Sequence, residues 1–207
     1  SLLAVASSAE AAPVKRVAFD LRGDFIVAGN TMGQDCDPAV PTPLTGTVSN
    51  CGTNLVDSDG AAIDVLWRRE ADGSFVANQT VLPSQARSRS HIDLTNRTVR
   101  YARIYWSGLA FETCTPTSGP TSCGDQVDTT ATLIGPDGVS RNLTADAQWV
   151  VDARYQASAD VTSIVQNGGT GGYDLTGVDS FKPFNLQSGD VYAGWSILSL
   201  LKEMPIM

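Results

Sequence analysis

A single histidine restricts the acid–base chemistry that this sequence could support. His91 lies in the segment RSRSHIDL and is the one histidine of the chain. A Ser-His-Asp site needs a positioned imidazole, and a nucleophile elbow needs a glycine on each side of its serine. Ser196 lies in GWSIL, which lacks the second glycine. We therefore predict that the protein is not an enzyme.

Alternating basic residues form a candidate ligand-binding face. Arg87, Arg89 and His91 occupy every second position of one segment, and alternate residues of a β-strand point to the same side. A strand here would gather two guanidinium groups and an imidazole, which suit an acidic glycan or a phosphate. The alternative is a solvated strand face that binds nothing.

Three aspartates around a glycine form a candidate calcium site. Asp57, Asp59 and Asp64 lie in VDSDGAAID, and clustered carboxylates beside a glycine turn can bind Ca²⁺. The spacing does not match an EF-hand, because a third ligand before the glycine and a glutamate at the end of the loop are missing. A turn rich in aspartate without metal explains the same residues. No other cofactor is predicted.

Four cysteines indicate disulfide bonds rather than a zinc site. They are Cys36, Cys51, Cys114 and Cys123. None forms a C-x-x-C motif, and one histidine is too few for the common zinc ligand sets. Four cysteines allow three pairings; pairing in sequence order would close two local loops, each worth about 3 kcal/mol on the chain-entropy model. Four free thiols are the alternative.

Both ends of the chain bear on where the protein works. Residues 1–11, SLLAVASSAEA, are similar to the second half of a secretory signal peptide with cleavage after Ala11.

The net charge of −8 opposes binding to nucleic acids and anionic membranes. The apolar segment 193–201 is shorter than the roughly 20 residues of a membrane span, so we predict a buried interior strand there. A secreted protein with no transmembrane segment is expected.

The remaining sequence favours strands and turns. Charged residues make up 17% of the chain, and 19 glycines and 10 prolines accompany many Thr, Ser, Asn and Asp. We predict a mainly β fold: an antiparallel β-sandwich, jelly-roll-like, with one short helix and long disulfide-pinned loops. A single domain is expected over residues 12–207, truncated at its C-terminus. Its core is predicted to rest on Phe25, Trp67, Tyr105, Trp106, Trp195 and Ile197.

Several elements can be placed by residue range. We expect one bent strand or two strands at 14–30, a hairpin around Asp72-Gly73, a central strand at 98–109 and a strand–turn–strand unit at 129–145. We also expect a helix within 155–169 that Ser158 caps and Gly168-Gly169 ends. The loops at 31–54 and 110–128 are the expected binding surfaces, because rigid scaffolds commonly present ligand contacts on loops.

Four segments, taken in order, resemble a known kind of protein. They are RGDFIVAGNTMGQDC, VRYARIYWSG, YQASADVTSIVQ with GGYDLTGV, and YAGWSILSLL. Together they are similar to the N-terminal domain of very large secreted bacterial surface proteins, most of all those associated with adventurous gliding motility in myxobacteria. The resemblance spans nearly all of residues 20–203, but the ending LKEMPIM departs from it. It implies a cell-surface location and Ig-like repeats further along the same chain, and it carries over no catalytic residue.

Three functions therefore remain open at this point. The first is a non-enzymatic extracellular module of an adhesin-like protein, which binds a surface glycan or a protein ligand. The second is a carbohydrate-binding module, Ca²⁺-assisted, that uses exposed aromatic residues such as Tyr155 or Tyr173. The third is a secreted hydrolase with a pair of carboxylates, which cannot be located from sequence alone.

Overall fold

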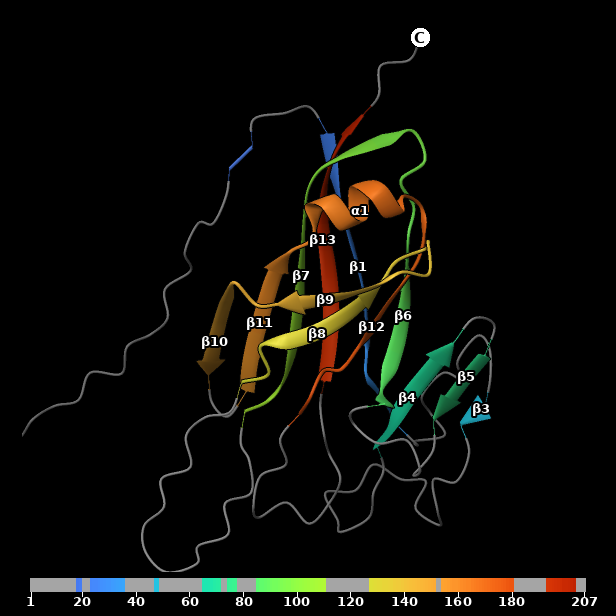
Figure 1. The fold of residues 1–207 in the computed structure, drawn as a ribbon, viewed down its shortest axis with the longest axis vertical. Helices are drawn as coiled ribbons and strands as arrows, with labels where there is room; N and C mark the ends of the chain where they lie inside the picture. Colours follow the sequence, from blue (N-terminus) through green and yellow to red (C-terminus); the bar gives the residue numbers. More distant parts are fainter. Residues whose placement is uncertain are drawn as a thin grey trace, which may run out of the picture.

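The computed structural model describes residues 18–19, 23–35, 47–48, 65–71, 74–77, 85–110, 127–151, 154–180 and 193–203. Within these ranges the chain forms thirteen strands and one helix, so the fold is mainly β, as predicted (Figure 1). The four cysteines, the three aspartates of the candidate calcium site and residues 1–11 lie outside the described residues. The disulfide bonds, the calcium site and the signal-peptide remnant therefore stay predictions.

Five strands form an antiparallel sheet. Their order is β1 (Gly23–Thr31), β13 (Ala193–Glu203), β7 (Arg97–Leu109), β11 (Arg154–Asp160) and β10 (Ala147–Val151). The third position belongs to β7, which confirms the predicted central strand. Its neighbour β13 hydrogen-bonds to β1 on one side and β7 on the other. The predicted buried interior strand is confirmed as well.

The second sheet has eight strands and is mixed. Its order is β3 (Thr47–Val48), β5 (Ser74–Ala77), β4 (Val65–Ala71), β6 (Arg87–Ile92), β12 (Gly171–Thr176), β8 (Thr130–Ile134) and β9 (Ser140–Thr144), with β2 (Gly33–Asp35) on β4. The hairpins β4–β5 and β8–β9 confirm two predicted units. The β3–β5 and β4–β6 pairs are parallel, which corrects the expectation of a wholly antiparallel fold. Strand β5 returns along one side of β4, and β6 then runs in the direction of β4 along its other side.

The predicted helix is shorter than expected, because its first half is a strand. The helix α1 spans Thr162–Gly168 and ends next to Gly169, as predicted. The segment before it is β11, which pairs with β7 and β10, so its backbone groups are satisfied without a helix. Ser158 is not a cap: it is buried in β11, and its Oγ accepts a hydrogen bond from Arg103 Nη2 at 2.9 Å. Asp160 Oδ1 instead accepts the Thr162 N–H at 2.8 Å at the start of the helix.

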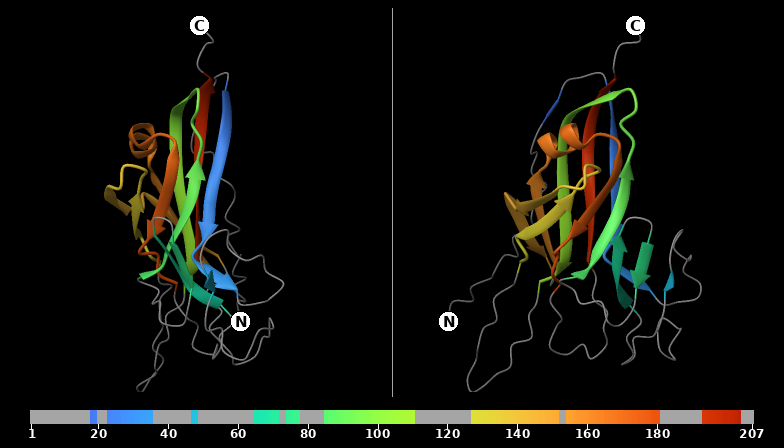
Figure 2. Two further views of the ribbon diagram at one scale, coloured as in Figure 1. Left: turned by 90° about the vertical axis from the view of Figure 1, so that its right-hand side faces the viewer. Right: turned by 45° about the vertical axis from the view of Figure 1, so that its right-hand side comes forward.

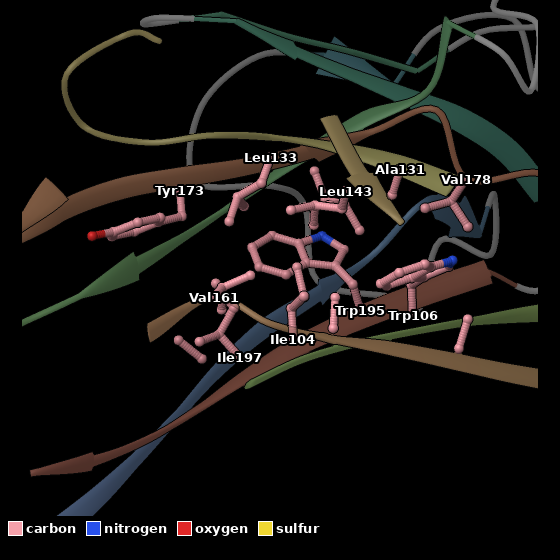
Figure 3. Close-up of a cluster of buried hydrophobic side chains, with 14 of the residues drawn as sticks. Ile104, Trp106, Ala131, Leu133, Leu143, Val161, Tyr173, Val178, Trp195 and Ile197 are labelled. Carbon is pink, nitrogen blue, oxygen red and sulfur yellow. The ribbon is translucent and has the colours of Figure 1, made fainter. Parts of the chain in front are cut away.

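The two sheets lie face to face as a β-sandwich around an apolar core. Figure 2 shows them as two layers, with α1 at one end. Figure 3 shows the side chains that meet between the layers: Ile104, Trp106, Trp195 and Ile197 from the five-stranded sheet, and Ala131, Leu133, Leu143 and Tyr173 from the other. The Trp195 indole N–H donates to Ser88 Oγ at 2.7 Å, across the gap between the sheets.

Of the six predicted core residues, three are buried, two are partly buried and one is exposed. Trp106, Trp195 and Ile197 belong to the core, whereas Trp67 and Tyr105 are only partly buried. Phe25 is 61% exposed. Its register partner is Leu200, which lies on the outer side of β13, so Phe25 also points outward. The inward residues of β1 are Ile26 and Ala28, and sequence alternation alone could not distinguish the two faces of this strand.

The core position of Trp195 generates a first prediction. Trp195→Ala should lower the free energy of unfolding by roughly 3–5 kcal/mol, because it removes a buried ring and leaves a cavity. Chemical denaturation followed by circular dichroism measures this. The matched control is Phe25→Ala on the neighbouring strand, which should change stability by no more than about 0.5 kcal/mol. Equal losses in the two variants would contradict the inward placement of Trp195.

Candidate functional site

A shallow depression of about 300 Å³ lies on the outer side of the five-stranded sheet. We call it the outer-face depression. The residues that line it are Asn30, Tyr105, Trp106, Ser107, Gln156, Gly194, Trp195 and Ser196. They come from β1, β7, β11 and β13, so the depression lies on the middle of the sheet. Most of the loops at 31–54 and 110–128, which the sequence favoured as binding surfaces, lies outside the described residues.

Strand register creates the depression. Ser107 pairs with Gly194 on one side and with Gln156 on the other. In the next row Tyr105 pairs with Ser196. Because Trp106 and Trp195 point into the core, these alternate neighbours point outward. The middle of the depression is low because Gly194 has no side chain and the two serines have small ones. The larger side chains of Tyr105 and Gln156 form its sides.

A glycine on β1 permits the close approach of strands at this place. Gly29 pairs with Ser196. A Cβ at Gly29 would overlap the carbonyl oxygen of Trp195 and lie 2.7 Å from the Cα of Ser196. Any other residue would therefore push β1 away from β13 at the rim of the depression.

The chemistry of the outer-face depression is polar and uncharged. Ser107 and Ser196 contribute hydroxyl groups, Gln156 contributes an amide, and Tyr105 contributes an aromatic ring with a phenol group. None of the eight described lining residues is acidic or basic. Such a surface can hydrogen-bond to a neutral ligand with many hydroxyl groups, and it offers no carboxylate pair for acid–base catalysis.

Sequence reasoning missed this site, although a signal for it was present. In the segments YWSG and GWS, small polar residues alternate with tryptophan. If the tryptophans face the core, the serines and Tyr105 must share the opposite face. The missing information was that β7 and β13 are neighbours in this register, which places the two segments side by side.

The predicted basic face lies on the outer side of the other sheet. Arg87 and Arg89 converge there on Asp174 of β12, whose side chain is only 1% exposed. Arg87 Nε lies 2.9 Å from Asp174 Oδ2, and Arg89 Nε and Nη2 lie 2.5 and 2.8 Å from its two carboxylate oxygens. His91 is exposed on the same strand, opposite Gly172. The structure thus brings the two arginines together on a carboxylate that the sequence did not single out.

Gly172 makes room for one of these arginines. A Cβ at this glycine would lie 3.1 Å from Arg89 Cδ and 3.3 Å from Arg89 Nε. The Arg89 side chain therefore lies across β12 where that strand has no side chain of its own. This keeps the guanidinium group against Asp174, two residues further along β12.

The aromatic residues that we expected to be exposed are buried. Tyr155 is 1% exposed and Tyr173 is 0% exposed. Tyr155 Oη donates to the carbonyl oxygen of Asp179, and Tyr173 Oη donates to the carbonyl oxygen of Gly169 at 2.8 Å. Burial raises the pKa of Tyr173 to about 12. Neither ring is accessible to a sugar, because the alternation of β11 and β12 points both into the core; this part of the carbohydrate hypothesis was wrong.

The described residues contain neither a cluster of metal ligands nor a membrane-spanning helix. Across the described ranges, no three His, Cys, Asp or Glu side chains come together as metal ligands. In the same ranges, no helix has the length and apolar character that crossing a membrane requires. Comparison of the chain with protein-family models, curated proteins and solved structures finds no match.

The buried position of Asp174 generates a second prediction. Asp174→Ala should destabilise the protein by about 3 kcal/mol, at the low end for a broken buried pair, because the two arginines are partly solvated. Chemical denaturation at neutral pH measures this loss. Asp137→Ala is the control: Asp137 pairs with Arg141 on the surface, and its loss should matter far less. Comparable losses would show that Asp174 is no more important than a surface pair.

Asp179 generates a third prediction, on pH. Partial desolvation of the exposed Asp179 side chain, followed by repulsion from Asp128, raises the pKa of its carboxyl group. Between the unfolded pKa, about 3.9, and the higher folded value, the folded state binds more protons, so this group costs stability as pH rises through that window. Asp179→Asn should therefore be more stable than the parent at neutral pH, with the advantage vanishing in acid. Its backbone N–H can still donate to Asp128 Oδ2.

The control for this prediction is a carboxyl group with the opposite shift. Hydrogen bonds from Thr95 lower the pKa of Asp93, so Asp93 contributes stability at neutral pH that is lost as pH falls. Asp93→Asn should therefore lower stability at neutral pH. Denaturation curves across the acidic range would contradict the assignment if both variants changed with the same sign.

Proposed function

We propose that this chain is a non-enzymatic extracellular module of a large cell-surface or secreted adhesin-like protein, and that it recognises its ligand through the outer-face depression. The observation that carries the proposal is the lining of this depression. Its hydroxyl, amide and phenol groups can bind a ligand, and none of its eight lining residues has the charge needed for acid–base catalysis. Strand positions hold these groups more rigidly than loops do, which favours recognition without rearrangement.

The extracellular part of the proposal has support from the sequence. The signal-peptide-like residues 1–11, four cysteines in loop sequence and the resemblance to gliding-motility-associated surface proteins all point outside the cell. The proposal includes jelly-roll-like connectivity, disulfide-pinned loops, and Ig-like repeats further along the chain.

A neutral carbohydrate is the ligand class that the depression favours. Sugars present hydroxyl groups at their edges and C–H groups on their faces. Ser107, Ser196 and Gln156 can hydrogen-bond to the former, and the Tyr105 ring can contact the latter. A carbohydrate-binding module is therefore the second candidate function, with Tyr105 in the role once expected of Tyr155 or Tyr173. The hydrolase alternative gains nothing from this site, because the depression has no carboxylate.

A fourth prediction tests the site. Ser107→Tyr fills the middle of the depression and should weaken binding to a neutral glycan by roughly tenfold or more, the change expected when about 1.4 kcal/mol of contacts is lost. An array of neutral bacterial and plant glycans identifies the ligand, and isothermal titration calorimetry measures the affinity. Ser140→Tyr, an exposed serine on β9 of the other sheet, is the control.

The outcomes separate clearly. Binding that Ser107→Tyr weakens by roughly tenfold or more and Ser140→Tyr preserves supports recognition at the outer-face depression. Binding that both variants retain places the ligand elsewhere on the protein. An absence of binding by the parent protein across the array argues against a glycan ligand for this face.

A further inference from the structure

We propose that the outer side of the eight-stranded sheet carries a second, independent binding site, which takes a carboxylate or sulfate group of an acidic polysaccharide. The site consists of Arg69 on β4 with Arg87, Arg89 and His91 on β6, and we call it the arginine face. It lies on the other sheet from the outer-face depression, so it can be tested independently of the proposed function.

Parallel pairing places a third arginine on this face. Arg69 of β4 is in register with Arg87 of β6, and residues in register on adjacent strands point to the same side. The neighbouring Arg68 points the other way: it is buried, and its Nη1 donates to Asn30 Oδ1 at 2.8 Å. Arg69 is therefore exposed beside Arg87 on the outer side of the sheet.

The charge of the arginine face is positive in a chain of net charge −8. The carboxylate of Asp174, which is 1% exposed, lies beneath Arg87 and Arg89 and pairs with both of them, whereas Arg69 lies beside Arg87 without contacting that carboxylate. The two arginine side chains keep 27% and 33% of their surface exposed. Asp93, the nearest acidic residue along β6, follows the end of that strand, and its Oδ1 accepts the Thr95 N–H at 2.9 Å.

Asp174 prepares the site rather than neutralising it. Asp174 accepts from Nε and Nη2 of both arginines, so it holds the two guanidinium groups in place before any ligand arrives. Guanidinium groups offer five N–H donors in a planar fork that matches carboxylate and other oxyanions. Like charges directly opposite on neighbouring strands repel each other, so Arg69 beside Arg87 is costly without an anion and favourable with one.

A polysaccharide suits this face better than a nucleic acid. Nucleic-acid binding depends on neutralising a row of closely spaced phosphates, and the acidic chain around this compact face would repel the rest of such a polymer. A sparsely charged acidic polysaccharide, with one carboxylate or sulfate for every two or more sugars, spaces its charges more widely and has neutral hydroxyl groups between them. One or two such charges can bind here while the remaining sugars meet the uncharged surface of the same sheet.

The test compares polymers and matched charge variants. Hyaluronate supplies one carboxylate per disaccharide, chondroitin sulfate supplies sulfates as well, dextran is the neutral control, and single-stranded DNA supplies phosphates. We expect at least one acidic polysaccharide to bind the parent protein in calorimetry at about 0.15 M salt and to weaken strongly at about 1 M. Arg69→Gln should reduce this affinity by roughly tenfold, as expected for the loss of one charged hydrogen bond. Arg69 is exposed and does not contact Asp174, so the variant should keep its fold.

Arg100→Gln controls for net charge, because Arg100 is an exposed arginine on β7 of the other sheet. It should leave polysaccharide binding unchanged. Equal losses in the two variants, or no binding to either acidic polysaccharide, would overturn the proposal, and tighter binding to DNA would replace the polysaccharide with a phosphate polymer. Ser107→Tyr should retain acidic-polysaccharide binding, which distinguishes failure of this site from failure of the outer-face depression.

Discussion

The pairing of Trp106 with Trp195 sets the geometry on which the rest of the molecule depends. These residues are partners on β7 and β13, and both indoles are buried between the sheets. Each ring also satisfies its N–H: Trp195 donates to Ser88 Oγ, and Trp106 donates to the carbonyl oxygen of Asp128 at 2.9 Å. A slip of one residue in either strand would turn the tryptophan of that strand to the outer side of the sheet. The register that buries them is the same register that places Ser107, Ser196 and Tyr105 together on the outer face.

Polar side chains join the two layers where the apolar core ends. Asn30 of β1 donates to the carbonyl oxygen of Arg89 at 2.9 Å and accepts from Arg68, so it connects the five-stranded sheet to β6 and β4. Glu70 of β4 pairs with Arg68 and accepts the backbone N–H of Arg89. Buried polar groups of this kind are costly unless paired, so these contacts hold the arginine face and the rim of the depression in fixed positions.

Local patterns predicted most of the elements, because alternation and turn residues act over a few neighbours. The β8–β9 hairpin follows from its turn: Gly138 adopts a φ of 71°, and its N–H donates to the carbonyl oxygen of Gly135. The interior position of β13 follows from apolar residues on both of its faces. The same reasoning failed at residues 154–160, where sheet partners on both sides outweighed the helical spacing seen in sequence. It also failed at Phe25, because an apolar strand does not reveal which face is covered.

The sequence by itself determined a mainly β chain, an interior strand at its end, and a row of alternating basic residues, since each of these depends on near neighbours. Only the tertiary structure decided which other side chains those residues contact. Asp174 is separated from Arg87 and Arg89 by more than eighty positions and joins them through the β6–β12 pairing. Tyr105 and Ser196 are equally distant in sequence and adjacent in the sheet. Strand order and register create such neighbours, and they come from burying the whole core at once rather than from any one segment.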